Sequence, residues 1–155
     1  MATKKKSARR PRDADAERKP LLGALLRLAH ESVAEHVAQG LISFGFDDLP
    51  PDYVTVVQPL WVEADGASIS DLATHAGVTR ASMVTLVDSL EARGYVTVPR
   101  GRTGQVRLTE RGRTLAATIR ALVTAIENLW SERFGQKRIE ALRDTLTALV
   151  TEDWQ

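Results

Sequence analysis

Apolar residues recur at intervals of three and four positions along much of the chain, the spacing of helices that bury one face. One run begins at Pro20 and stops near Gly40, where a loop of sequence GLISFGFDDLPP follows. A second helix is predicted over residues 51–64, with Pro51 in its first turn. Pro59 should kink or break this helix, because an interior proline removes a hydrogen bond. Two more helices are predicted near the end, with apolar faces of Leu115, Ile119, Leu122, Ile126, Leu129 and Trp130, and of Ile139, Leu142, Leu146 and Leu149.

Two shorter helices are predicted in the middle of the chain. Ser68 and Asp71 have the spacing of a capping box, which indicates a helix start. Gly77 should end that helix, Thr79 should cap the next one, and Gly94 should end it. Their predicted buried positions are Ile69, Leu72, Ala73 and Ala76, then Met83, Leu86, Val87 and Leu90. This arrangement is typical of a helix-turn-helix.

A hairpin is predicted directly after these two helices. Residues 95–98 and 105–108 are short strand-like runs on either side of the turn sequence PRGRTG. A helix-turn-helix followed by a hairpin with arginines at its tip is a winged helix-turn-helix. The predicted fold class is therefore mainly α with a small β wing. The apolar faces of the first and last helices exceed what one small domain needs, so these terminal helices are expected to mediate dimerisation.

Charge is distributed unevenly along the 155 residues, although the formal net charge is only +1. Residues 1–20 hold eight basic and three acidic side chains, whereas residues 21–79 hold one basic and eight acidic ones. Residues 80–113 hold seven arginines and three acids. Two basic blocks favour contact with a polyanion such as DNA, although such runs are also common on solvated surfaces. Residues 1–19 are predicted to form a basic, disordered arm.

Several classes of function find no support in the sequence. The chain has no cysteine, which argues against disulfides and thiolate metal sites. No apolar run is long enough to predict a membrane span or a signal peptide, so a cytoplasmic protein without membrane association is expected. The three histidines are too dispersed to predict a metal site, and neither a cofactor motif nor an enzyme motif is present.

The segment DLATHAGVTRASMVTLVDSLEARGYV, followed by VRLTERGR, resembles the MarR family of bacterial transcriptional regulators. The resemblance implies an obligate homodimer, held by its first and last helices, that represses inverted-repeat operators in double-stranded DNA. It also implies that a small phenolic or lipophilic ligand often releases the DNA. The corresponding domain bounds are 1–19 for the arm, 20–50 for an N-terminal dimerisation helix and loop, 51–113 for the DNA-binding domain and 114–155 for the C-terminal dimerisation helices.

The predicted DNA-contacting residues lie on the second helix of the motif and on the wing. They are Thr79, Arg80, Ala81, Ser82, Val84, Thr85, Arg100, Arg102 and Arg107. Arg80 is the favoured base-reading residue, with phosphate contact nearly as well supported. Val84 and Thr85 stand where the family has a threonine–arginine pair, and the wing is about four residues shorter than usual. By the same resemblance, Asp88 should orient the wing through an ion pair with Arg100 or Arg102.

An effector pocket is predicted less directly. The resemblance puts it between the DNA-binding part and the dimerisation helices, with candidate lining residues His30, Phe44, Phe46, Tyr53 and Trp61. Ordinary packing in the hydrophobic core is the better supported interpretation of these five residues. The function predicted is a dimeric, sequence-specific transcriptional regulator, most simply a ligand-released repressor. An architectural or protein-interaction module that binds DNA without specificity is the main alternative, and an enzyme is a second one.

Overall fold

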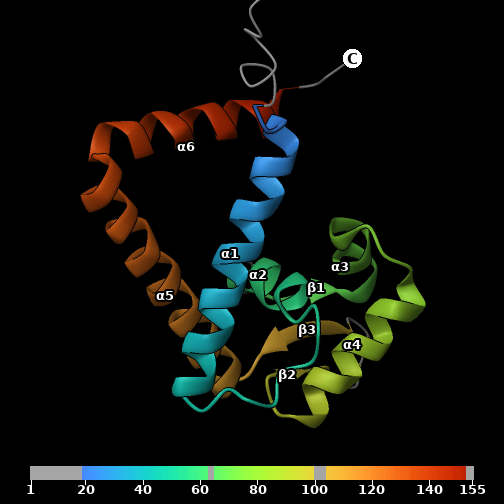
Figure 1. Ribbon diagram of the computed structural model, residues 1–155. Helices are drawn as coiled ribbons and strands as arrows, with labels where there is room; N and C mark the ends of the chain where they lie inside the picture. The colour runs from blue at the N-terminus through green and yellow to red at the C-terminus, as the bar shows by residue number, and fades with distance from the viewer. Residues whose placement is uncertain (1–18, 63–64, 100–103, 153–155) are drawn as a thin grey trace, which may run out of the picture.

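A computed structural model describes residues 19–62, 65–99 and 104–152. The elements occur in the order α1 (Leu22–Ser43), α2 (Val54–Val62), β1 (Ala67–Ser68), α3 (Ile69–Ala76), α4 (Arg80–Ala92), β2 (Val96–Thr97), β3 (Gln105–Leu108), α5 (Glu110–Phe134) and α6 (Gln136–Thr151). Figure 1 shows the small sheet with α3 and α4 at one end of the molecule and α6 at the other. The predicted fold class, mainly α with a small β wing, is confirmed.

Helix α1 extends past the glycine that was expected to end it. It continues through Gly40 to Ser43, and Gly45 then takes a positive φ of 83°. A Cβ on Gly40 would lie 2.7 Å from the nearest side-chain carbon of Leu122 on α5. Gly40 therefore lets α1 and α5 approach each other closely, and helix propensity alone did not indicate this role.

Helix α2 is short but unbroken, although Pro59 lies inside it. The helix begins at Val54, so Pro51 precedes it and does not occupy its first turn. Proline at position 59 removes only the bond to the carbonyl of Thr55, in the first turn of the helix. Burial of Val56, Val57 and Leu60 on one face stabilises the remaining structure.

The sheet has three antiparallel strands in the order β1-β3-β2. Strands β2 and β3 form the predicted wing, with Val96 opposite Leu108 and Thr97 opposite Arg107. Strand β1 was not predicted; it places Ala67 opposite Val106. Gly66, just before β1, has a φ of 88°, and a Cβ there would lie 2.5 Å from the carbonyl oxygen of Val106. A glycine is therefore needed for β1 to lie along β3.

One core joins the C-terminal half of α1, α2, the helix-turn-helix, the wing and the start of α5. Its fully buried side chains include Leu41, Val56, Val57, Leu72, Met83, Val87, Leu90, Tyr95, Val96, Val106 and Leu115. Of the four predicted core residues of α4, Met83, Val87 and Leu90 are completely buried, and Leu86 is partly buried. By contrast, α6 has no buried residue. The core thus includes the helix-turn-helix and the wing, whereas α6 lies largely outside it.

Candidate nucleic-acid interface and ligand cavity

The turn between α3 and α4 is built by local capping. The Ser68 hydroxyl accepts a hydrogen bond from the Asp71 N–H (3.1 Å) and donates one to the Asp71 carboxylate (2.7 Å). Gly77 ends α3 in the left-handed conformation, with a φ of 65°. Thr79 then caps α4 by accepting a hydrogen bond from the Ser82 N–H (3.1 Å). These caps set the angle at which α4 leaves the body of the domain.

The face of α4 opposite its buried side is polar and accessible. Arg80, Ala81 and Thr85 are exposed, and Val84 is half-buried. Thr85 donates a hydrogen bond to the Ala81 carbonyl (3.2 Å) within the helix. A helix with an exposed face of this kind can enter the DNA major groove.

Two of the predicted contact residues also hold the start of α4 together. The hydroxyls of Thr79 and Ser82 lie 2.8 Å apart, so one donates to the other. Both side chains are exposed. Each hydroxyl oxygen can still accept or donate one more hydrogen bond, for example to a phosphate.

Only part of the predicted wing contact can be described. Arg107 on β3 is exposed, and its Nε donates to the Asp65 carbonyl (2.9 Å), which leaves the outer nitrogens of the guanidinium accessible. Arg100 and Arg102 lie outside the described residues. Asp88 is exposed on α4, and its predicted ion pair with either arginine stays a prediction.

A long-range polar cluster, which was not predicted, ties the α1–α2 loop to the segment between α4 and β2 and to the start of α5. The buried Tyr95 donates its hydroxyl proton to Asp48, and Arg111 donates to Asp48 (3.1 Å) and to the Tyr95 oxygen (2.9 Å). The Arg111 guanidinium lies 4.4 Å from the centre of the Tyr95 ring and also donates to the Arg93 carbonyl. The cluster therefore joins the end of α4 to the start of α5.

The electrostatics of this cluster follow from its geometry. The hydrogen bond from Tyr95, helped by the charge of Arg111, lowers the pKa of Asp48. Burial, followed by the hydrogen bond to Asp48, raises the pKa of Tyr95 to about 12. In the sequence, Asp48 is one of the eight acidic residues of the segment 21–79. No local spacing indicates its partners, since they lie 47 and 63 positions away.

A cavity of about 590 Å³ lies between α1, α2 and α5, and we call it the α1–α2–α5 cavity. Three of the five predicted pocket residues, His30, Tyr53 and Trp61, line it. Its walls are mostly apolar, and they are completed by Val33, Ala34, Val37, Ala38, Val54, Gln58, Ile119, Arg120, Val123, Thr124 and Glu127. The phenol of Tyr53 is a hydrogen-bond donor at the wall of this cavity, and burial raises its pKa. The size and lining suit a small organic ligand.

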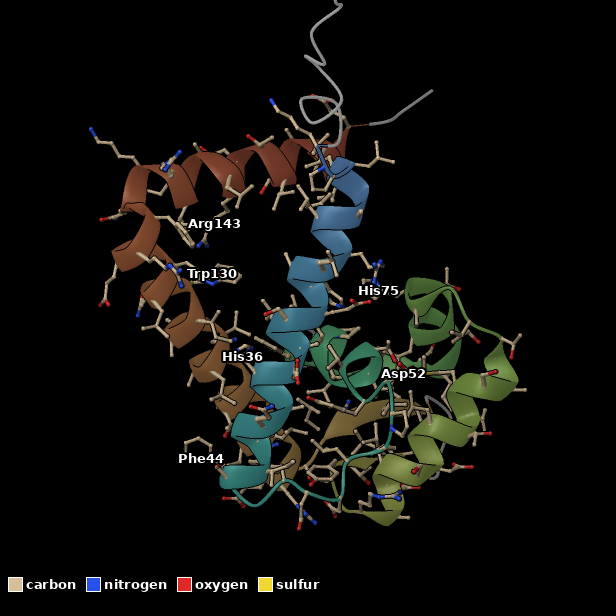
Figure 2. All side chains as sticks on the ribbon, viewed as in Figure 1. His36, Phe44, Asp52, His75, Trp130 and Arg143 are labelled. Carbon is tan, nitrogen blue, oxygen red and sulfur yellow. The ribbon has the colours of Figure 1, made fainter. Side chains whose placement is uncertain are left out.

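The other two predicted pocket residues lie elsewhere. Phe46 is buried in the core, with its ring centre 6.2 Å from that of Tyr95. Phe44 is 65% exposed, and Figure 2 shows it at the end of α1, pointing outward. The reason is that α1 continues to Ser43, which carries Phe44 past the cavity. Within the described residues, no group of three or more acidic or histidine side chains could hold a metal ion, and no helix is long and apolar enough to cross a membrane.

The arrangement of α3, α4 and the β2–β3 hairpin defines a winged helix-turn-helix protein. The sequence model of the MarR family matches residues 60–105, which span α3, α4 and the start of the wing. A comparison with curated protein sequences finds no match.

Solved structures resemble the chain over most of its length. The transcriptional repressor CouR from Rhodococcus jostii RHA1, bound to p-coumaroyl-CoA, has 27% sequence identity and a TM-score of 0.65, and the match covers 86% of this chain and 94% of CouR. The Mycobacterium tuberculosis MarR family protein Rv2887, in complex with DNA, has 28% identity and a TM-score of 0.65, with coverage of 84% and 98%. The same protein with p-aminosalicylic acid has 28% identity and a TM-score of 0.63, with coverage of 85% and 100%. Together with the sequence model, they confirm the resemblance of this chain to the MarR family of transcriptional regulators.

Proposed function

We propose that the chain is a dimeric, sequence-specific repressor that binds inverted-repeat DNA and releases it when a small ligand binds. The exposed polar face of α4, held on a fully buried opposite face, is the observation that carries the proposal. The DNA complex of Rv2887, a protein 28% identical to this chain, supports the same use of the fold. Arg80 starts α4 and is exposed, so it is the residue we expect to reach base edges or phosphates.

Exposed apolar side chains on the terminal helices support a dimer. On α1 and just before it, Leu21, Leu22, Leu25 and Leu28 are between 45% and 81% exposed. On α6, Leu142 and Val150 are 48% and 82% exposed. Apolar surface of this kind is stabilised by a partner, and a second copy of the chain places two α4 helices for two half-sites about 34 Å apart.

The ligand part of the proposal rests on the α1–α2–α5 cavity. It lies where α2 of the DNA-binding part meets α1 and α5, so its occupation can alter the spacing of the two α4 helices. CouR with p-coumaroyl-CoA and Rv2887 with p-aminosalicylic acid, both 27–28% identical to this chain, support a small aromatic effector.

The test is fluorescence anisotropy with DNA from the promoter region of the chain's own gene, against scrambled DNA of equal length. We expect tight binding of the promoter DNA only, and loss of that preference in Arg80→Gln. Exposed Arg138 on α6 provides the matched control, since Arg138→Gln should bind like the unmodified chain. If Arg80 instead contacts phosphate in each subunit, the log–log salt slope should become about 1.8 less negative. Equal binding of scrambled DNA would contradict the proposal and favour an architectural role.

A further inference from the structure

A second cavity, of about 490 Å³, lies between α2, β3 and the start of α5. We call it the arginine cavity, because three of its lining residues are Arg107, Arg113 and Arg120. The remainder of its lining is apolar and consists of Leu60, Trp61, Leu108, Ala116 and Ala117. Trp61 and Arg120 also line the α1–α2–α5 cavity, so the two cavities meet at this pair.

The three guanidinium groups donate few hydrogen bonds to other parts of the chain. Arg107 donates from Nε to the Asp65 carbonyl, and Arg113 donates from Nη1 to the Leu108 carbonyl (3.1 Å). Arg120 lies over the Trp61 ring, 4.9 Å from its centre. In the described parts of the chain, none of the three pairs with a carboxylate, since the ion pairs there involve other residues. A guanidinium has five N–H donors, so most of this donor capacity faces the cavity or solvent.

Three arginines around one apolar floor exceed what a single carboxylate requires. A carboxylate is satisfied by one bidentate arginine, whereas phosphate groups offer more oxygens and more charge to a cluster. Each cavity alone has the volume of a small-molecule site, so a single aromatic ring fills only one of them. The occupant of both cavities therefore has two chemically different parts.

We propose that the effector is a phosphate-bearing amphiphile, of the class of coenzyme A thioesters. Its aromatic or acyl body occupies the α1–α2–α5 cavity, and its phosphates contact Arg113 and Arg120, with Arg107 beside them. Arg120, stacked on Trp61, lies at the junction and contacts both parts. This inference rests on the proposed ligand-responsive function and names the chemistry of its ligand.

Isothermal titration calorimetry on the full chain tests the inference with three probes: p-coumaroyl-CoA, coenzyme A and p-coumaric acid. Arg113 lines only the arginine cavity, so Arg113→Gln is the informative variant. We expect it to weaken binding of both coenzyme A compounds about tenfold or more, the usual effect of losing a charged hydrogen bond. Binding of p-coumaric acid should be unchanged, and Arg113→Lys should retain part of the affinity. Arg107 is left intact, because it is also a candidate DNA contact.

The control variant Arg138→Gln should bind all three probes like the unmodified chain, and thermal melts establish that each variant folds. Equal affinity of Arg113→Gln and the unmodified chain for the coenzyme A compounds would overturn the inference. So would p-coumaric acid binding as tightly as its thioester, or a lack of binding by both coenzyme A compounds at low salt. DNA binding without ligand, measured separately by anisotropy, tests the proposed function, so the two failures can be told apart.

Discussion

Gly112 is the position where adding one methyl group should harm the fold most clearly. Its φ is not positive, so its conformation suits any residue, and the constraint is space. A Cβ there would lie 2.0 Å from the Tyr95 carbonyl oxygen and 3.1 Å from the carbonyl carbon. The same carbonyl accepts hydrogen bonds from the Thr109 N–H (3.0 Å) and from the Thr109 hydroxyl (3.1 Å). Gly112 thus allows the first turn of α5 to lie directly on the end of the helix-turn-helix.

The magnitude follows from this distance. Real Cβ atoms essentially never approach a neighbour within 3.0 Å, so α5 or the Tyr95 backbone has to move by about 1 Å, which strains the Thr109 bonds. Overpacking of this kind costs about 1–3 kcal/mol, and the better helix propensity of alanine returns roughly 0.5–1 kcal/mol. We therefore expect Gly112→Ala to lower the free energy of unfolding by about 1 kcal/mol, which for a chain of this size lowers Tm by roughly 2–4 °C.

The assay is thermal and urea unfolding, monitored by circular dichroism at one protein concentration because a dimer's stability depends on it. Gly23→Ala in α1 is the matched control, since a Cβ there meets nothing within 4 Å in the chain. Its Tm should stay the same or rise. If Gly112→Ala were as stable as Gly23→Ala, the close approach of α5 to Tyr95 would be refuted.

Three further predictions concern pH and capping. Burial and the bond to Asp48 raise the pKa of Tyr95 from 10.0 to about 12, so the contribution of this neutral phenol to stability is present below pH 10 and is lost as pH rises toward 12. The free energy of unfolding in urea should therefore fall by up to roughly 2–3 kcal/mol across this range in the unmodified chain, and by less in Tyr95→Phe. The pKa of Asp48 is lowered, so the contribution of its carboxylate to stability is present above about pH 4 and is lost as pH falls further. Asp48→Asn should unfold at a lower urea concentration at neutral pH, and its free energy of unfolding should fall less steeply as the pH is lowered. Ser68→Ala should lower the free energy of unfolding by about 1 kcal/mol through the missing N-cap, whereas Ser70→Ala, two residues later, should stay within about 0.5 kcal/mol; equal losses would contradict the capping role.

The parts of this fold that the sequence predicts are those determined by residues close together in the chain. Ser68 and Thr79 cap their helices as the local sequence indicates, and Gly77 and Gly94 take positive φ values. The apolar spacing of α4 predicted which side is buried, and hence which side can face DNA. These features depend on residues within one or two turns of each other.

The parts that could not be predicted depend on distant partners. Strand β1 has only two residues, and it exists because β3, nearly 40 positions later, offers a free edge. Asp48 owes its role to Tyr95 and Arg111, which no spacing in the sequence connects to it. The arginine cavity is likewise assembled from α2, β3 and α5. Phe44 was expected to line the effector pocket, but α1 continues past Gly40 and carries Phe44 away from the α1–α2–α5 cavity.

Helix α6 buries none of its residues within the chain, while the helix-turn-helix and the wing share one core. In the proposed dimer, a subunit with a damaged α4 can therefore still pair with an intact one through its terminal helices. Such a mixed dimer has one intact α4 helix and can contact only one half-site of the operator, which is too little for tight binding. In a cell holding both gene copies, an allele such as Arg80→Gln should thus be genetically dominant, whereas an allele that unfolds the terminal helices should be recessive.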